Sequence, residues 1–449
     1  MSSAGTPDDL MIAIYGLGYV GTSIAAAWLR AGAVVEGFDL SAERIANLNN
    51  PKSIDFEQAV EEAFDSGLMS GRLRLHSLGE GVIPQANVKF VCVSVYLSKE
   101  EKRADLTSLK GAADSVGATL KEGDAVVICP SVPPGTTRNV VIPLLEKSSG
   151  LSSEKDFDVI YSPERILVGR AVEDIEKRYP TIISGVNEKS LNRAESLFLR
   201  VAQKGVVRMP NLETAEFEKL AEGVFRDINI ALANELAMAC DELGVNYWAV
   251  REAANSQPFC NLHVPGLGVG GACIPVYPWF ATQSLKKSGS KIIEVSREIN
   301  ESMVQYLVSS LETNFKVSPK SKLAILGLAF RGGVADSRMS VTYRLVELLR
   351  ERGIDQIQVH DPLILTDSTL GKTLTNDLGK VLTTADIAII ATDHKNYAQY
   401  PWDAVSRKGS KLKVIDCKGL LLGKKYSNVE IFGLGYGRDN NPRIYEAPA

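Results

Sequence analysis

A glycine-rich turn between a short apolar strand and a helix is the sequence feature that most constrains this chain. Residues 16–21 read G-L-G-Y-V-G, directly after the run MIAIY and directly before the helical segment TSIAAAWLRAG. In a dinucleotide-binding fold, Gly16 allows the tight turn, Gly18 lets the backbone approach a pyrophosphate, and Gly21 permits close packing of helix on strand. The N–H groups of the helix N-terminus then face the anion. The pattern predicts a dinucleotide site, and a chance glycine cluster is the alternative.

An acidic residue at the end of the next predicted strand indicates which dinucleotide binds. Asp39 follows Gly21 by 18 residues. Its carboxylate can accept hydrogen bonds from both hydroxyls of an adenosine ribose and would repel a 2′-phosphate, so NAD is favoured over NADP. A solvated carboxylate at a strand end is the alternative. We assign further cofactor contacts to side chains near these positions, namely Tyr19, Val20, Arg44 and Ser94.

Short β-branched runs alternate with helical stretches in two separate parts of the chain. Between Met11 and about Pro210 the runs are MIAIY, AVVEGFD, VKFVCVSV, AVVICP, DVIYS and PTIIS. After about Pro319 they are KLAILGLAF, IDQIQVHDP, DIAIIATD, KLKVIDCK and NVEIF. This alternation predicts an α/β protein: a parallel sheet flanked by helices, as a Rossmann-type dinucleotide-binding domain, in the first part, and a second, Rossmann-like α/β domain in the other.

A long helical pattern separates the two parts. From Glu213 to about Leu243 apolar residues recur at spacings of three and four, without proline, which predicts one long helix. Its Leu, Ile and Ala content suggests burial on several sides, so we expect it to connect domains and to pack against a partner subunit. We divide the chain into a dinucleotide-binding domain at 1–210, a central helical and dimerisation domain at 211–317 with the loop HVPGLGVGGACIPVYP, and a C-terminal domain at 318–449.

Bulk composition limits the kinds of partner and compartment. With 449 residues, 45% hydrophobic and 23% charged, the chain has the size and composition of a multi-domain globular protein. A formal net charge of −4 gives no reason to expect nucleic acid or an anionic membrane as partner. Six scattered cysteines without a C-x-x-C pair argue against metal sites and disulfides. The polar start MSSAGTPDDL indicates neither signal peptide nor membrane span, so we expect a cytoplasmic protein.

Five sequence blocks follow the glycine-rich turn in order. They are SVPPGTT from Ser131, YSPERI from Tyr161, ETAEFEKLAEGVFRDINIALANELA from Glu213, PGLGVGGACIPVYPWF from Pro265 and GLAFRGGVADSR from Gly327. Together they resemble the UDP-glucose/GDP-mannose dehydrogenase family, particularly its branch acting on UDP-N-acetylhexosamines. Enzymes of that family oxidise the C6 alcohol of the sugar to a carboxylate in two NAD-dependent steps. The resemblance implies a UDP-sugar substrate, a role in polysaccharide biosynthesis, a C-terminal domain that closes over UDP, and a homodimer or higher homo-oligomer built across the long helix.

The resemblance assigns the central chemistry to one cysteine. Cys273 matches the family cysteine that captures the intermediate aldehyde. Its thiolate adds to the aldehyde, oxidation of the thiohemiacetal leaves a thioester, and water cleaves it. The surrounding glycines, among them Gly268 and Gly270, would let substrate and backbone approach the sulfur closely. On residue type alone a single cysteine is more often a small buried hydrophobe, and the loop context reverses that expectation.

Three further residues match catalytic positions of the family. Lys219 matches a lysine whose ammonium stabilises the alkoxide and later oxyanions, and its alternative is a solvated helix lysine. Glu164 matches a glutamate used for proton transfer or water activation, with a helix-capping carboxylate as the alternative. Ser131 falls where many relatives carry threonine, and its hydroxyl is expected to hold the water or the sugar.

Basic and polar residues in two loops are candidates for substrate binding. Arg331 and Arg338 match basic residues that the family uses to reach substrate phosphate and cofactor, respectively, and solvated arginines are the alternative. No G-x-G-x-x-G follows the strand KLAIL, so we propose no second dinucleotide site. Asn261 and His263 are sugar or nucleotide contacts, or equally loop-capping residues. The remaining predicted substrate contacts are Arg165, Ile166, Gly268 and Gly270.

Three positions depart from the pattern of most relatives. Gly223 stands where relatives place an asparagine one helical turn after the lysine, and Tyr277 where they place an aspartate four positions after the cysteine. Ala272 stands where a histidine is frequent in the hexosamine branch. A phenol is a poor base near neutral pH, so hydrolysis would fall to Glu164 or another carboxylate. Glycine in mid-helix costs about 1 kcal/mol relative to alanine, and we hypothesise that a ligand group needs the space.

These departures leave three hypotheses about the function. The first is a dehydrogenase that completes both oxidations. The second is a variant that stops early or runs a reversible oxidation. The third is a nucleotide-sugar-binding protein that has lost catalysis, against which the joint presence of Cys273, Lys219 and Glu164 argues.

Overall fold

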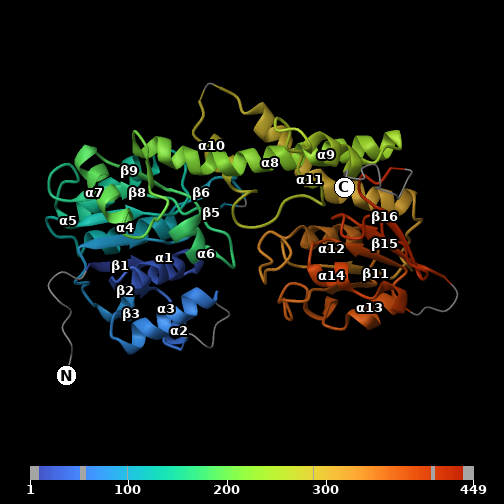
Figure 1. The fold of residues 1–449 in the computed structure, drawn as a ribbon, viewed down its shortest axis with the longest axis horizontal. Coiled ribbons are helices and arrows are strands. Elements are labelled where there is room, and N and C mark those ends of the chain that lie inside the picture. The colour runs from blue at the N-terminus through green and yellow to red at the C-terminus, as the bar shows by residue number, and fades with distance from the viewer. Residues whose placement is uncertain (1–9, 51–56, 99, 287, 406–409, 438–449) are drawn as a thin grey trace, which may run out of the picture. The chain divides into compact units, whose positions relative to one another are not determined.

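The computed structural model describes residues 10–50, 57–98, 100–286, 288–405 and 410–437 (Figure 1). The prediction for the first nine residues therefore lies outside the described part. The chain divides into two compact units, one of residues Met1–Glu222 and Trp279–Lys286, the other of Gly223–Pro278 and Lys287–Ala449. Each unit is built around its own sheet, so the predicted α/β class with two sheets is confirmed.

The sheet of the first unit has eight strands in the order β10-β9-β8-β7-β4-β1-β2-β3. Every pair from β8 to β3 is parallel. Strand β1 lies between β4 and β2, and four of its five residues are buried, as expected for a strand covered on both faces. The strands are β1 Met11–Tyr15, β2 Val34–Asp39, β3 Leu73–Ser77, β4 Val88–Val91, β7 Ala125–Ile128, β8 Asp158–Tyr161, β9 Thr181–Gly185 and β10 Val206–Arg208.

One pair in this sheet corrects the prediction of a purely parallel arrangement. Strand β9 runs antiparallel to β8, and β10 runs parallel to β9. In the connection 162–180, the N–H of Gly169 donates to the hydroxyl of Tyr19 at the start of α1, 2.8 Å away. The chain therefore stays at the carboxyl edge of the sheet after β8, and β9 begins there and runs back.

Helices cover both faces of this sheet, because alternate residues of a strand point to opposite sides. Ile12 and Ile14 face a core completed by α1, α3 and α7. Ala13 and Tyr15 face a second core, to which α4 and α5 contribute. The helices are α1 Tyr19–Arg30, α2 Ala42–Leu48, α3 Gln58–Met69, α4 Thr107–Gly117, α5 Ile142–Ser149, α6 Ala171–Glu173 and α7 Glu188–Phe198, and a hairpin joins β5 Tyr96–Leu97 to β6 Ala104–Asp105.

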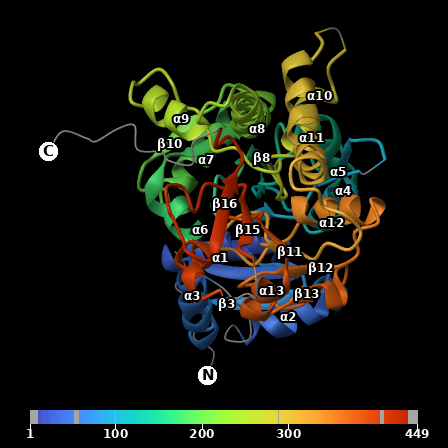
Figure 2. The same cartoon turned by 90° about the vertical axis from the view of Figure 1, so that its right-hand side faces the viewer.

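The sheet of the second unit is parallel throughout, in the order β13-β12-β11-β14-β15-β16. In Figure 2 the labels β16, β15, β11, β12 and β13 follow one another in the reverse of this order. If the strands are counted along the chain, this is the 3-2-1-4-5-6 order of a dinucleotide-binding sheet. The strands are β11 Leu323–Leu326, β12 Ile357–His360, β13 Leu374–Thr375, β14 Ile387–Ile390, β15 Leu412–Asp416 and β16 Val429–Gly433.

Helices also cover both faces of the second sheet. Leu323 and Ile325 pack with α11 and α12, while Ala324 and Leu326 pack with α13, α14 and residues of α8 and α9. Helix α8 spans Leu212–Leu243, which confirms the predicted long helix. The others are α9 Tyr247–Asn255, α10 Tyr277–Thr282, α11 Lys291–Thr313, α12 Val341–Glu351, α13 Leu378–Thr384 and α14 Lys395–Gln399. None of the helices in the described ranges is both long and apolar enough to cross a membrane.

Candidate active site

The glycine-rich turn of the first unit has the geometry that its sequence predicts. Gly16 has a φ of +95°, a conformation that side chains disfavour. A side chain on Gly21 would overlap the carbonyl oxygen of Gly16, so helix α1 can approach the turn only with glycine there. Around Gly18, by contrast, no atom lies within 4 Å of where a side chain would begin. This open position at the N-terminus of α1 leaves room for a pyrophosphate against the backbone.

Two predicted cofactor residues hold this turn from both sides. Asp39 ends β2, and its Oδ2 accepts a hydrogen bond from the N–H of Leu17 at 2.9 Å, while its Oδ1 accepts from Ser41 N–H at 2.9 Å. The Nε of Arg44 donates to the carbonyl of Leu17 at 3.0 Å. Because each carboxylate oxygen has two lone pairs, Asp39 keeps acceptor capacity for ribose hydroxyls. The residues present therefore fit NAD.

Strand direction gathers the other candidates of the first unit. Ser94 follows β4, Ser131 follows β7 and Glu164 follows β8. Since these strands are parallel to β1 and β2, their carboxyl ends lie at the same edge as Gly16 and Asp39. The strand order reverses between β4 and β1, and ligands of open α/β sheets bind at such a switch point.

Glu164 has the electrostatic setting of a group that exchanges protons near neutral pH. Burial raises the pKa of its carboxyl group to about 7, although the charges of Lys219 and Arg165 act in the opposite direction. Lys219, on α8, is thus close enough to Glu164 to influence its ionisation. A carboxyl group of this pKa can serve as a general base or acid at physiological pH.

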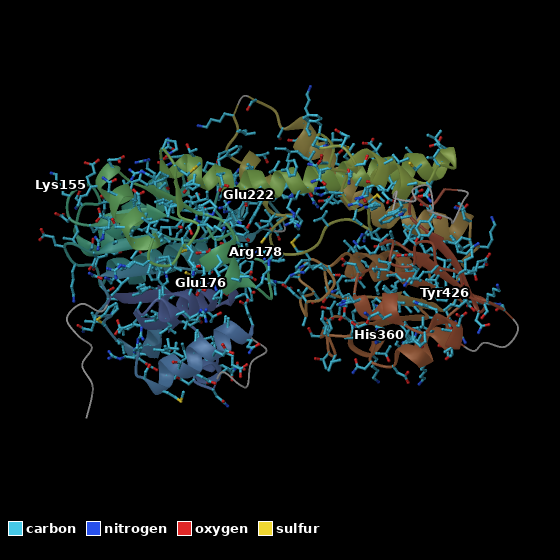
Figure 3. The ribbon with its side chains drawn as sticks, in the orientation of Figure 1. Lys155, Glu176, Arg178, Glu222, His360 and Tyr426 are labelled. Carbon is cyan, nitrogen blue, oxygen red and sulfur yellow. The ribbon has the colours of Figure 1, made fainter. Side chains whose placement is uncertain are left out.

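The neighbouring candidates of the YSPERI segment make contacts within the protein. The guanidinium of Arg165 donates to the carbonyl of Pro180 and to Glu222 at 3.1 Å, the latter a residue of α8 that is labelled in Figure 3. It also lies over the ring of Tyr179. Ile166 is half-buried. The contacts of Arg165 are thus with the protein itself, and the substrate role of Arg165 and Ile166 stays a prediction.

Glu216 is a residue that the sequence analysis missed. It is fully buried on α8, one turn before Lys219, and accepts hydrogen bonds from the N–H groups of Gly135 and Thr137 at 2.5 and 2.7 Å. Burial raises its pKa to about 7 against the effect of these bonds. Glu216 therefore ties the loop that begins at Ser131 to α8. The sequence signal that could have identified Glu216 is the presence of a glutamate on the apolar face of a predicted helix.

In the second unit, the loop that carries Cys273 ends in a hydrogen-bonded turn. Cys273 is exposed, and its carbonyl accepts hydrogen bonds from the N–H groups of Val276 and Tyr277, each at 3.0 Å. Before it, the N–H of Gly271 donates to the carbonyl of Arg338 at 2.9 Å. The cysteine loop and the loop of the predicted arginines are therefore in contact, as binding of one substrate by both loops would require.

The glycines of the cysteine loop permit close approach, but to the protein's own atoms. A side chain on Gly268 would come within 2.5 Å of the carbonyl oxygen of Asn300. One on Gly270 would come within 2.8 Å of the carbonyl oxygen of Met339 and 2.9 Å of Phe330. These two positions are thus glycines because the loop is packed against α11 and the 330–339 segment. Their predicted contact with substrate stays untested.

A buried polar network, which the sequence analysis also missed, supports this loop. Asp227 of α8 pairs with Arg297 of α11 at 2.7 Å and accepts from Asn300 at 2.9 Å. The side chain of Asn300 accepts from Asn234, which in turn accepts from the N–H of Gly266 at 2.8 Å. All five residues are almost inaccessible to solvent. An isolated buried charge would be costly, so the network fixes both helices and the start of the loop.

The remaining candidates lie in loops of the second unit. Arg338 pairs with Asp336, its Nη2 lying 2.6 Å from Oδ2, and is exposed. Arg331 is half-buried, and its guanidinium lies over the ring of Phe330. Asn261 is exposed, whereas the ring of His263 meets Phe225 edge to face. Burial and the charges of two nearby arginines, Arg226 and Arg251, lower the pKa of His263, which favours a neutral ring.

The second sheet repeats the first turn with a different outcome. Gly327 has a φ of +113°, and Asp361, directly after β12, accepts from the N–H groups of Leu328 and Ala329 at 2.7 and 2.8 Å. Unlike Asp39, however, Asp361 is fully buried and also bonds to His394 and to the backbone of the next loop. Its lone pairs are occupied, so it offers no acceptor to a ribose.

Fold and cofactor turn together define a class of protein. A parallel sheet with a glycine-rich turn after β1 and an acidic residue at the end of β2 is the cofactor-binding domain of NAD-dependent enzymes. The second α/β unit adds an exposed cysteine on a glycine-rich loop.

Comparison with protein families identifies the chain more closely. Residues 10–202 match the NAD binding domain of the UDP-glucose/GDP-mannose dehydrogenase family, residues 213–302 its central domain and residues 324–422 its UDP binding domain. The chain belongs to the UDP-glucose/GDP-mannose dehydrogenase family, and it is an NAD-dependent nucleotide-sugar dehydrogenase.

Individual relatives cover nearly the whole chain. It is 34% identical over 417 residues to the UDP-N-acetyl-D-mannosamine dehydrogenase of Pyrococcus horikoshii, covering 92% of this chain and 96% of the relative. It is 30% identical to an NDP-N-acetyl-D-galactosaminuronic acid dehydrogenase of Ralstonia solanacearum, with coverages of 93% and 98%. A solved structure of UDP-D-ManNAc dehydrogenase from P. horikoshii superposes with a TM-score of 0.86 at 32% identity, over 96% of this chain and all of that one.

The geometry of Asp39 leads to a prediction about cofactor choice. Asp39→Asn keeps one acceptor oxygen but removes the charge, so we expect kcat/KM for NAD to fall about 10- to 100-fold, as for loss of a charged hydrogen bond. The ratio of NADP to NAD efficiency should rise, because a 2′-phosphate is no longer repelled. Glu43→Gln removes a charge from an exposed residue nearby and should leave the ratio unchanged. An unchanged ratio in Asp39→Asn would contradict the assignment.

The pKa of Glu164 leads to a prediction about pH. A base must be ionised to accept a proton, so kcat/KM should fall as pH decreases through about 7, the pKa of the Glu164 carboxyl. We expect Glu164→Gln to lose this limb of the pH profile along with most of the rate. Glu216 has a similar pKa, so Glu216→Gln is the matched control and should keep the limb. Retention of the limb in Glu164→Gln would show that another group is the base.

Proposed function

We propose that the protein oxidises the C6 hydroxyl of a UDP-sugar to the uronic acid through a covalent intermediate on Cys273. The observation that carries this proposal is an exposed cysteine, in a hydrogen-bonded turn supported by a buried network, in a chain whose first unit fits NAD. A nucleophile of this kind has no use in simple alcohol oxidation. It is needed when the aldehyde must be oxidised further, because addition of a thiolate gives a thiohemiacetal whose carbon can donate a hydride.

Residues of the chain divide the proposed chemistry as follows. Glu164 accepts the proton of the C6 hydroxyl, as its pKa of about 7 allows. The ammonium of Lys219 stabilises the developing oxyanion, and the hydroxyl of Ser131 holds a water or the sugar. The Sγ of Cys273 adds to the aldehyde carbon, and water activated by Glu164 later releases the acid from the thioester. Bound NAD supplies the oxidising power for both steps.

The substrate is proposed to be a UDP-N-acetylhexosamine. Support comes from the match to the family's UDP binding domain and from relatives named for N-acetyl-D-mannosamine and N-acetyl-D-galactosaminuronic acid. Arg331 and Arg338, at the carboxyl end of β11, are proposed to contact substrate phosphate and cofactor, because a guanidinium matches phosphate oxygens. We keep the division into domains at 1–210, 211–317 and 318–449 as part of this proposal.

A reaction that stops after one oxidation is the second candidate. One observation favours it: the residue four positions after Cys273 is Tyr277, whose buried phenol is a poor base. The two candidates differ in the product, which is an aldehyde or an acid.

We also propose that the protein forms a homodimer through α8. Three large apolar side chains of this helix are exposed, Phe217 to 49%, Phe225 to 55% and Leu232 to 43%. Their spacings of eight and seven residues place them along one face of the helix. Large exposed apolar side chains repeated along a helix are typical of a subunit interface.

The role of Cys273 is tested by substitution. Cys273→Ala should lower formation of the uronic acid from a UDP-N-acetylhexosamine by on the order of 10⁴-fold, as loss of a catalytic nucleophile does. Cys260→Ala, at a half-buried cysteine earlier in the same region, is the matched control and should retain activity. Mass spectrometry of enzyme quenched during turnover should find the sugar on the Cys273 peptide. Full turnover to the acid in Cys273→Ala would refute the covalent route.

The dimer is tested by light scattering after size-exclusion chromatography. The native chain should have twice the 48.7 kDa mass of one chain. Phe225→Glu combined with Leu232→Glu places charges in the proposed interface and should yield monomers. Met69→Glu changes a residue of α3 that is 85% exposed and should leave the dimer intact. A native monomer at every concentration would rule the interface out.

A further inference from the structure

We infer that Tyr277 is the positioning residue of the catalytic cysteine, and that it acts as a pair with Gly223. The inference rests on the proposed role of Cys273 as the nucleophile. It concerns two positions at which this chain departs from most of its relatives. All residues on which it depends belong to the second unit.

The first observation is that the ring of Tyr277 occupies the place of a side chain at Gly223. A Cβ built on Gly223 would overlap Cδ2 of the ring and lie 3.1 Å from both Cβ and Cγ of Tyr277. Both residues are buried, and only 8% of Tyr277 is exposed to solvent. Glycine in mid-helix is therefore required by the tyrosine, and no ligand group needs to be invoked for this space. The earlier hypothesis of a ligand at Gly223 is wrong.

The second observation links the ring to the sulfur-bearing residue. The N–H of Tyr277 donates to the carbonyl of Cys273 at 3.0 Å, and α10 begins at Tyr277. The two residues are thus the ends of one hydrogen-bonded turn. Because the ring is seated on α8, it fixes the turn, and the turn fixes the direction in which the exposed thiol of Cys273 projects.

The third observation is that the same face of α8 holds the other end of the loop. Asn234 accepts the N–H of Gly266. It follows Gly223 by 11 residues, close to three helical turns, so both side-chain positions point the same way. Asp227, one turn after Gly223, anchors the intervening network. The cysteine loop therefore has two anchors on one face of one helix, and Tyr277 is the anchor nearer to Cys273.

These contacts give the two departures a common explanation. At the contact the helix position has no side chain and the loop residue is large, so the ring of Tyr277 fills the volume beside Gly223. Burial of the ring offsets the helix-destabilising effect of a glycine in mid-helix. Tyr277 thus acts through the packing of its ring against Gly223.

The test is a double-mutant cycle of Gly223→Ala and Tyr277→Ala, with Tyr277→Phe and Tyr277→Leu as further variants. Gly111→Ala is the matched control, because Gly111 is also a helical glycine but has open space at its Cβ. Two quantities are measured in each variant: kcat and KM for NADH formation, and the rate at which iodoacetamide alkylates Cys273, followed by mass spectrometry from pH 6 to pH 9.

Loss of positioning should affect turnover rather than cofactor binding. We expect Tyr277→Ala to lower kcat by about 10- to 100-fold, as misplacement of a reacting group does, with KM for NAD unchanged. The alkylation profile of Cys273 should shift along the pH axis or in amplitude. Tyr277→Phe, which keeps the ring, should stay within about threefold of the native rate. Gly223→Ala should also have a lower kcat. The double variant should lose no more activity than Tyr277→Ala alone, because the two changes disrupt one contact.

Two results would overturn the inference. One is additive effects in the cycle, and the other is a native alkylation profile and kcat in Tyr277→Ala. If Gly223→Ala does not fold, as judged by its melting curve, Tyr277→Ala and Tyr277→Leu still decide the matter. If the proposed function is wrong, Cys273→Ala will still form the uronic acid. If only this inference is wrong, Cys273 will be essential for acid formation and Tyr277 will be dispensable.

Discussion

Parallel pairing of β1 with β2 and β4 is the constraint on which the rest of the first unit depends. Because these strands share one direction, every loop that follows them emerges at the same edge. Because β7 and β8 are parallel to them as well, the turn at Gly16, the carboxylate of Asp39 and the candidates Ser131 and Glu164 gather at this edge without being close in sequence. A strand of opposite direction at any of these places would send its loop to the far edge. The single reversal, at β9, comes only after the last of these loops.

The two sheets show how one backbone device serves two purposes. In both, a glycine with positive φ follows the first strand, and an aspartate at the end of the second strand accepts hydrogen bonds from the backbone of that turn, one N–H in the first sheet and two in the second. Asp39 keeps free acceptor positions at the surface, whereas hydrogen bonds from His394 and the backbone N–H groups of Ala329 and Leu363 overcome the effect of burial and lower the pKa of Asp361 to about 2. The first carboxylate is suited to a ligand and the second to holding its own loops.

Periodicity predicted the strands and the long helix because their apolar patterns are local. The short strands β3, β10 and β13 were missed, since runs such as LRLHS carry too little apolar signal. The glycine-rich turn was predictable for the same reason, as its three glycines lie within six residues and directly follow a strand. What could not be predicted are contacts between distant segments. Glu216 with Gly135 and Tyr277 with Gly223 join residues far apart in the chain, and no pattern in either segment indicates its partner.

The central proposal is that this chain, with Gly223 and Tyr277, completes both oxidations, the second of them on the adduct with Cys273. The most direct measurement is the amount of NADH formed per molecule of UDP-N-acetylhexosamine consumed, with the product identified by mass spectrometry. The account predicts two NADH per sugar and a product that has gained one oxygen and lost two hydrogens, as a uronic acid has. One NADH per sugar with an accumulated aldehyde, or binding without any NADH, would contradict it.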